Sequence, residues 1–178
     1  MYVWIGIETE SQLKTIKEKA RKIENDIGFL HSNFTLPLHI SLKMAFKVSE
    51  ENFNAVVGDL LEYFKNVKPF EIKTGGICFE NVICWISMKR NDRLDNLHDY
   101  LNDFLNQKYG VPLHEYDTDY KYHTTLFSDS NEEKILRAYK LIEQEQIPKT
   151  INANTILIGC SESGNLGTFK IIHTIKLN

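Results

Sequence analysis

Along the first half of the chain, segments with a strand-like pattern of apolar residues take turns with segments that have a helix-like pattern. Short apolar runs bounded by turn-forming residues are typical of strands, and apolar residues three or four positions apart are typical of a one-sided helix. Gly28, Ser49 and Pro69 are expected to be a C-cap, an N-cap and a helix terminator. The predicted elements are a strand at 2–8, a helix from about 9 to 28, a strand at about 38–46, a helix from 49 to about 67, and a strand at 70–79 that Gly75 and Gly76 bend or bulge.

The second half of the chain repeats this order. The predicted elements are a strand at 82–88, a helix from Asn91 or Asp92 to about 110, a strand at about 121–127, a helix from Ser130 to before Pro148, a strand at 150–160, a turn at 162–167 and a strand at 168–177. Trp4 and Trp85 lie in corresponding strands. An internal repeat determines architecture, so we expect one domain, residues 1–178, built from halves of about 1–80 and 81–178.

One four-residue pattern occurs at corresponding places of the two halves: His39-Ile40-Ser41-Leu42 and His123-Thr124-Thr125-Leu126. Both copies lie in predicted strands, where residues i and i+2 share a face. His39 therefore points the same way as Ser41, and His123 the same way as Thr125. A pseudo-twofold axis between the halves would bring the two pairs face to face, giving two proton carriers and two neutral hydrogen-bond donors.

Composition limits the class of partner. The 178 residues carry a net charge of −3 with a pI of about 6.1, which disfavours a broad electrostatic interaction with duplex DNA. Cys78, Cys84 and Cys160 are odd in number and form no C-x-x-C pair, so we interpret them as small buried residues in a reducing compartment. The start of the chain resembles a strand rather than a signal peptide, and no apolar run reaches membrane-spanning length. We expect a cytoplasmic monomer without a membrane partner.

The two motifs and their separation resemble the 2H phosphoesterase superfamily, which includes the 2′-5′ RNA ligases and RNA 2′,3′-cyclic phosphodiesterases. The resemblance covers essentially the whole chain, and Pro37 before His39 is similar to the approach to the first motif in some members. It implies an α+β fold of two similar lobes, each an antiparallel sheet with helices, around a central cleft. It also implies that His39 and His123 are catalytic and that the substrate is an RNA end or a small nucleotide.

The residue types suit this chemistry. Cleavage of a cyclic phosphodiester needs water deprotonated on one side of phosphorus and an alkoxide protonated on the other, and histidine can do either near neutral pH. Ser41 and Thr125 can bind the phosphate by donating hydrogen bonds to its non-bridging oxygens. No metal or other cofactor is required. By analogy with hydrolytic members, we hypothesise that His123 activates water and His39 protonates the leaving oxygen.

Two further residues are candidates for substrate binding. Lys43 follows Ser41 at strand spacing and could offer a cation to a phosphate, although a solvated lysine at a strand end is the more common explanation. Tyr120 could stack a base, but it shares a face with Tyr122, which alternates away from His123, and this favours a core position. His98, between Leu97 and Asp99, is expected to face solvent.

Three alternatives remain open. His114, Asp117 and Asp119 could join a motif histidine in a metal site, although no recognised ligand spacing supports this. A cysteine could act as a nucleophile, although Cys78 and Cys84 lie in apolar surroundings that make a thiol inert. The same cleft could also belong to a non-catalytic module that binds RNA or a nucleotide. Chelator sensitivity separates the metal enzyme from the metal-free one, and turnover separates an enzyme from a binder.

Overall fold

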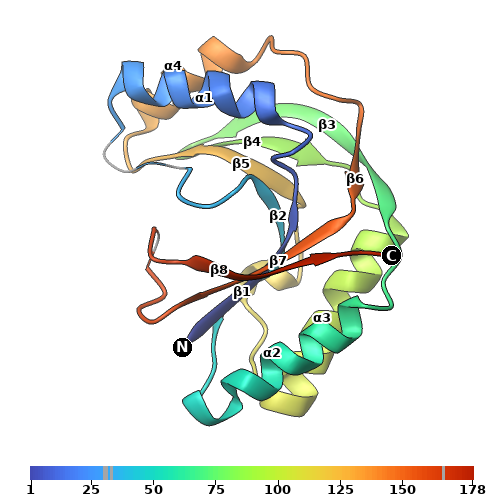
Figure 1. Ribbon diagram of the computed structural model, residues 1–178. Coiled ribbons are helices and arrows are strands. Elements are labelled where there is room, and N and C mark those ends of the chain that lie inside the picture. The colour runs from blue at the N-terminus through green and yellow to red at the C-terminus, as the bar shows by residue number, and fades with distance from the viewer. Residues whose placement is uncertain (30–31, 33, 166) are drawn as a thin grey trace.

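The computed structural model describes residues 1–29, 32, 34–165 and 167–178. The described residues form two four-stranded antiparallel sheets and their helices (Figure 1). The first sheet has the order β2-β1-β7-β8 and the second has the order β5-β4-β3-β6. In chain order the elements are β1 (Tyr2–Glu8), α1 (Lys14–Ile27), β2 (His39–Lys47), α2 (Glu50–Phe64), β3 (Phe70–Glu80), β4 (Ile83–Met88), α3 (Asp92–Tyr109), the 3-10 turn η1 (Glu115–Asp117), β5 (His123–Ser128), α4 (Glu132–Ile142), β6 (Thr150–Ala153), β7 (Thr155–Ser161) and β8 (Lys170–Lys176).

The two-lobed α+β fold expected from the sequence is confirmed, but each sheet takes strands from both halves of the chain. The strands β2-β1-β7 of the first sheet correspond to β5-β4-β3 of the second, so β3 and β7 are exchanged between the halves. The connection between β3 and β4 explains the exchange. Only two residues separate them, with Asn81 at a φ of 49°, and so short a connection makes antiparallel neighbours. The boundaries 1–80 and 81–178 therefore do not separate the two sheets.

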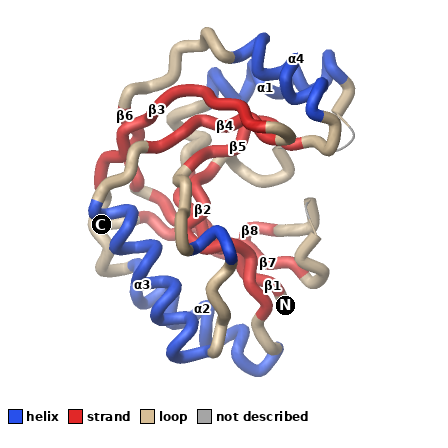
Figure 2. The backbone as a smooth tube through the Cα atoms, turned by 180° about the vertical axis from the view of Figure 1, so that it is seen from behind, coloured by secondary structure: helices blue, strands red, loops and turns tan. Residues whose placement is uncertain are grey.

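The helices pack in two pairs. α1 and α4 lie together over the second sheet, and α2 and α3 lie on the side of the first sheet (Figures 1 and 2). α1 connects β1 to β2 of the first sheet but contacts β5 of the second, while α3 connects β4 to β5 but contacts β2. Each crossing helix thus contributes apolar side chains to the opposite lobe, and the buried residues form one continuous core.

Local signals in the sequence placed some helix ends correctly, but α1 begins at Lys14 instead of about residue 9 and α2 ends at Phe64 instead of about residue 67. Gly28 ends α1 with a φ of 76°, and the side chains of Ser49 and Asn91 accept hydrogen bonds at the starts of α2 and α3. The start of α4 was one residue out, because Asn131 caps it instead of Ser130. The expected bulge in β3 is confirmed by a shift of register between Thr74 and Gly76.

The strand predicted at 150–160 is two strands in different sheets. β6 pairs with β3 and β7 pairs with β1, and Asn154 is the one residue between them. The apolar pattern runs through both strands, so it does not show where the chain passes from one sheet to the other.

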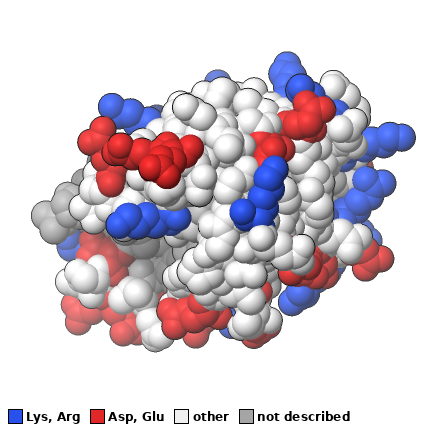
Figure 3. Space-filling model, turned by 90° about the horizontal axis from the view of Figure 1, so that it is seen from below, with Lys and Arg blue, Asp and Glu red and all other residues white. Residues whose placement is uncertain are grey.

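The surface agrees with the modest net charge. Figure 3 shows Lys and Arg side chains interspersed with Asp and Glu around a broad uncharged area, with no basic stripe across that face. Among the described helices, none is both long enough and apolar enough to cross a membrane.

Candidate active site

The two motif strands, β2 and β5, contact each other where the lobes meet. Their motifs occupy corresponding registers on the neighbouring strands. His39 lies opposite Glu8 with Ser41 opposite Gly6, and His123 lies opposite Ser87 with Thr125 opposite Trp85. Each histidine is half-buried, as is each hydroxyl residue. The correspondence of the two halves expected from the repeat therefore extends to the register of the motifs.

Each motif leucine lies in a break of strand pairing. The register moves by one residue between Ser41 and Lys43, and again between Thr125 and Phe127. Such a bulge reverses the alternation of faces. Lys43 and Phe127 are accordingly buried, and neither continues the open face that carries the histidine and the hydroxyl. The two bulges thus limit the polar part of each motif to two side chains.

Both histidine rings are held in the same way. Nδ1 of His39 lies 2.7 Å from the carbonyl oxygen of Pro37, and Nδ1 of His123 lies 2.6 Å from that of Lys121. A carbonyl oxygen can only accept, so Nδ1 carries the proton in both rings. In a neutral ring this leaves the Nε2 lone pair available to accept a proton.

The surroundings of His39 disfavour its charged form. Its pKa is lowered to about 4, mainly by desolvation and also by repulsion from His123, against the opposing effect of the hydrogen bond to the Pro37 carbonyl. The interaction with His123 places the two histidines within electrostatic reach of each other. His39 is therefore neutral at pH 7 when no ligand is bound.

Acidification is expected to destabilise the protein through His39. An unfolded histidine takes up its proton near pH 6.5, whereas folded His39 does so only near pH 4. The unfolded state therefore binds more protons in this window, and the free energy of unfolding falls as the pH falls through it. Denaturant unfolding at pH 7 and pH 4.5 should show a smaller loss of stability for His39→Gln than for the wild type. Equal losses would show that His39 titrates normally.

Trp4 was not anticipated as part of the site. Its ring centroid lies 4.2 Å from that of His39 in an edge-to-face arrangement, and its Nε1 donates a 3.1 Å hydrogen bond to Oγ of Ser41. Trp4 lies over Gly6, which is the register equivalent of Trp85 in the other lobe. The two tryptophans therefore occupy neighbouring, not identical, positions of the repeat.

A side chain at Gly6 is expected to disturb this arrangement. A Cβ there would lie 2.5 Å from Cζ2 of Trp4 and 2.9 Å from the carbonyl oxygen of Ile40. Overpacking of this kind typically costs about 1–3 kcal/mol, so Gly6→Ala should lower the free energy of unfolding and alter the fluorescence of Trp4. Gly58→Ala is the matched control, because its Cβ would meet nothing within 4 Å in the middle of α2. It should be neutral or stabilising by up to about 1 kcal/mol.

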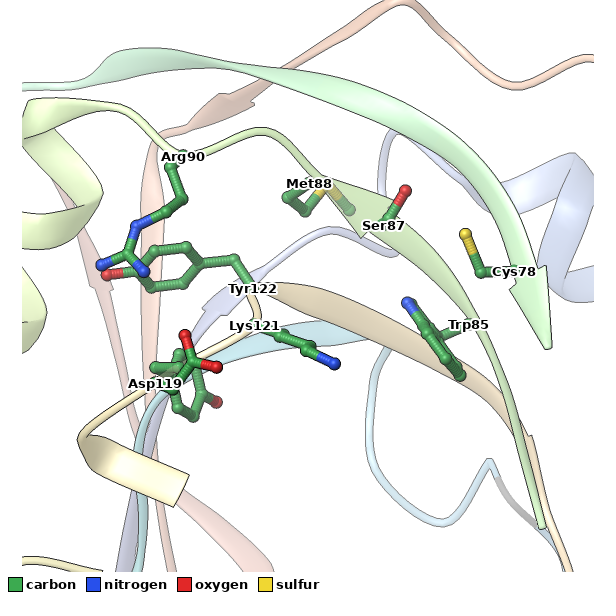
Figure 4. Close-up of a pocket in the computed structure, with 9 residues that line it drawn as sticks. Cys78, Trp85, Ser87, Met88, Arg90, Asp119, Lys121 and Tyr122 are labelled. Carbon is green, nitrogen blue, oxygen red and sulfur yellow. The ribbon is translucent and has the colours of Figure 1, made fainter. Parts of the chain in front are cut away.

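A pocket of about 310 Å³ is lined by residues next to the second motif, Lys121 and Tyr122 before it and Trp85 on the paired strand, although His123 and Thr125 are not in its lining. Its volume is near the lower limit for small-molecule sites, about 300 Å³. The ring of Trp85 lies in this pocket with its centroid 6.0 Å from that of His123. Figure 4 shows Arg90 and Asp119 at one end of the pocket and Trp85 with Cys78 at the other, with the amine of Lys121 pointing toward Trp85.

Lys43 does not reach this open region. It is 1% exposed, and its Nζ pairs with the buried carboxylate of Asp117. Both sequence interpretations, a phosphate ligand and a solvated lysine, are therefore wrong, because the bulge after Ser41 turns Lys43 toward the interior. His98 was also misplaced: it is buried beside this ion pair, with Nε2 3.6 Å from Oδ1 of Asp117.

Tyr120 is a core residue at the edge of the pocket. It is 5% exposed and stacks on His98 with ring centroids 4.8 Å apart, which leaves that face unavailable to a base. Burial raises the pKa of Tyr120, and a hydrogen bond with Ser41 partly offsets this. The Tyr120 hydroxyl therefore lies within hydrogen-bond reach of Ser41.

The structure disfavours the metal site and the cysteine nucleophile that the sequence left open. Asp117 pairs with Lys43 and accepts a 2.7 Å hydrogen bond from the backbone N–H of His114. Over the described ranges, no group of three or more His, Cys, Asp or Glu residues could hold a metal ion. Cys84 is buried, and desolvation raises the pKa of its thiol to about 12, as expected for an inert cysteine.

A model of the 2′-5′ RNA ligase superfamily matches residues 12–158. The chain belongs to this superfamily. Membership of the superfamily, whose members are 2H phosphoesterases, supports a phosphoesterase type of activity. No curated protein sequence matches the chain.

Solved structures share the fold of this superfamily member over almost its whole length. TT0787 of Thermus thermophilus superposes with a TM-score of 0.60 at 12% identity, covering 99% of this chain and 98% of that one. E. coli LigT in its apo form gives a TM-score of 0.59 at 16% identity, covering 99% and 96%. LigT complexed with 3′-AMP gives 0.56 at 16% identity, covering 99% and 97%.

Proposed function

We propose that the protein hydrolyses a 2′,3′-cyclic phosphate or a 2′-5′ phosphodiester in RNA or a nucleotide, without a metal ion. The observation that carries this proposal is the matched pair of histidines. His39 and His123 come from corresponding strands, each has Nδ1 bonded to the carbonyl two residues earlier, and each has a hydroxyl residue two positions later. Superfamily membership supports the same class of reaction, and the LigT complexes with 3′-AMP and ATP make nucleotides the first substrates to test.

The reaction needs two proton transfers. One histidine removes a proton from water as its oxygen attacks phosphorus, and the other donates a proton to the ribose oxygen as its bond to phosphorus breaks. The products are a phosphomonoester and a free hydroxyl. Ser41 accepts from Trp4 and also interacts with the Tyr120 hydroxyl, so it can donate to a non-bridging oxygen by turning its hydrogen away from Tyr120, and Thr125 has the corresponding place.

The low pKa of His39 reverses the roles that we hypothesised from the sequence. A residue that is neutral at pH 7 can accept a proton at once but cannot donate one from Nε2. We therefore assign His39 as the base and His123 as the acid. A nitrophenyl phosphodiester, whose leaving group needs no proton, should restore the activity of His123→Ala but not that of His39→Ala. Restoration of His39→Ala alone would return the roles to the original order.

Turnover in excess EDTA tests the function itself. The wild type should hydrolyse a nucleoside 2′,3′-cyclic phosphate at the same rate with and without the chelator. If activity disappears with EDTA and returns with a divalent cation, the metal-free mechanism is wrong. If the wild type binds RNA but turns over neither a cyclic phosphate nor a 2′-5′ dinucleotide, the protein is a binding module.

A further inference from the structure

Lys121 lies on the same open face as the second motif. The side chains from position 120 to 126 alternate between the core and the open face, and Met88 N–H donates to the Tyr122 carbonyl, continuing the pairing of β4 with β5. The buried positions are Tyr120, Tyr122, Thr124 and Leu126, and the open ones are Lys121, His123 and Thr125. Because residues i and i+2 share a face, Lys121 points to the same side as His123.

The amine of Lys121 is free to bind an anion. Within the described part of the chain, no carboxylate forms an ion pair with Lys121 and no side chain hydrogen-bonds its Nζ. The other cation of the pocket is engaged, since Arg90 pairs with Asp95 at 3.0 Å and also lies near Asp119. Lys121 therefore supplies the available positive charge of this pocket.

The direction of the Lys121 side chain places its charge near the motif. Figure 4 shows it running along the pocket with the amine toward Trp85. The Trp85 ring lies next to that of His123, and Trp85 is opposite Thr125 in the sheet. The amine is thus directed toward a ring that contacts His123 and belongs to the residue paired with Thr125.

The first motif has no equivalent cation among the described residues. The residue two positions before His39 is Pro37. Its carbonyl accepts a hydrogen bond from Nδ1 of His39, as that of Lys121 does from His123, but proline has no charged side chain. Lys43, the cation nearest along β2, is buried against Asp117. The two halves of the site are therefore alike in their histidines and hydroxyls but differ in charge.

We propose that Lys121 binds the phosphoryl group of the substrate, through its non-bridging oxygens, on the His123 side of the site. This inference rests on the proposed function for its substrate. A cation there offsets the negative charge that develops on these oxygens during attack by water. It would also orient the substrate in a nearly symmetric site. The cation attracts the anionic oxygens to the His123 side, and the leaving oxygen then faces His123.

Binding of inorganic phosphate tests this inference separately from turnover. We expect Lys121→Met to raise the Kd for phosphate by about 10- to 100-fold, as for loss of a hydrogen bond from a charged group, and to lower kcat/KM for the cyclic phosphate by a similar factor. Lys121→Arg should retain most of both. Lys47→Met is the matched control, because Lys47 is an exposed lysine at the far end of β2, and it should change neither quantity by more than about twofold.

The outcomes separate the two proposals. Phosphate binding that weakens in Lys121→Met and not in Lys47→Met supports the inference, even if no cyclic phosphate is hydrolysed and the proposed function fails. Equal affinities for wild type and Lys121→Met, or no phosphate binding by the wild type, would overturn it. Thermal unfolding of Lys121→Met shows whether the variant is folded. A second neutral variant, Lys121→Gln, should weaken phosphate binding in the same way.

Discussion

Replacing His39 or His123 by alanine is expected to lower kcat/KM for a nucleoside 2′,3′-cyclic phosphate by about 100- to 10,000-fold. A positioned acid or base contributes a factor of this size, and each histidine performs one of the two proton transfers. Because the transfers serve a single displacement, their effects should not multiply. The double variant should therefore be little slower than the slower single variant. Initial rates over a range of substrate concentration give the comparison.

A third histidine provides the control. His173 lies on β8, outside both motifs, and pairs in register with the buried Ile158. His173→Ala should keep the activity of the wild type within about twofold if the motif histidines alone perform the proton transfers. A motif variant that keeps more than a third of the wild-type activity would contradict the assignment of that histidine, provided that its circular dichroism matches the wild type.

Features encoded within a few residues were predictable. The caps at Gly28, Ser49 and Asn91 depend on one side chain and its immediate backbone. The pairing of a histidine with a hydroxyl on one face depends only on the period of a strand. The internal repeat then indicated that two such faces correspond, which is why the motif residues were identified before their surroundings.

Features that depend on distant partners were not predictable. Lys43 was expected on the face of Ser41, but a bulge reverses the alternation, and its partner Asp117 lies far along the chain. His98 precedes the charged Asp99 in sequence, yet α3 crosses to the other lobe and buries it. The ring of Trp4 can lie beside His39 because Gly6 has no side chain to displace it. This role of Gly6 is visible only once β1 is paired with β2.

Lys121 could have been found from the sequence. It lies two residues before His123, and the rule that joined His123 to Thr125 also places Lys121 on that face. The prediction extended the face after the first motif, to Lys43, instead of before the second. A bulge at each motif leucine turns the following residue into the core. The open face of each motif strand can therefore be extended only toward the residues that precede the histidine.

The buried ion pair between Lys43 and Asp117 links the two motifs. Lys43 belongs to β2, which carries the first motif, and Asp117 belongs to the short turn η1 that leads into the second. The pair is almost fully enclosed, next to His98 and Asn102 of α3. It therefore brings together β2, η1 and α3, which come from both halves of the chain.

Breaking this pair is expected to be strongly destabilising. Lys43→Met should lower the free energy of unfolding by about 3–5 kcal/mol, because it leaves the Asp117 carboxylate buried without a cation. Oδ1 of Asp117 has no hydrogen-bond partner among the described residues, so the backbone N–H of His114 and the nearby ring of His98 would be left to compensate the charge. Denaturant unfolding with a fixed m-value measures the difference.

Two matched variants show whether the buried charge is the cause. Lys43→Met combined with Asp117→Asn removes both charges, and the asparagine oxygen can still accept from the His114 N–H, so most of the lost stability should return. Lys65→Met removes a lysine from an exposed pair with Glu62 and should cost less than about 1 kcal/mol. If Lys43→Met costs no more than Lys65→Met, the ion pair does not hold the two motif segments together, and their relative position depends on the surrounding apolar core.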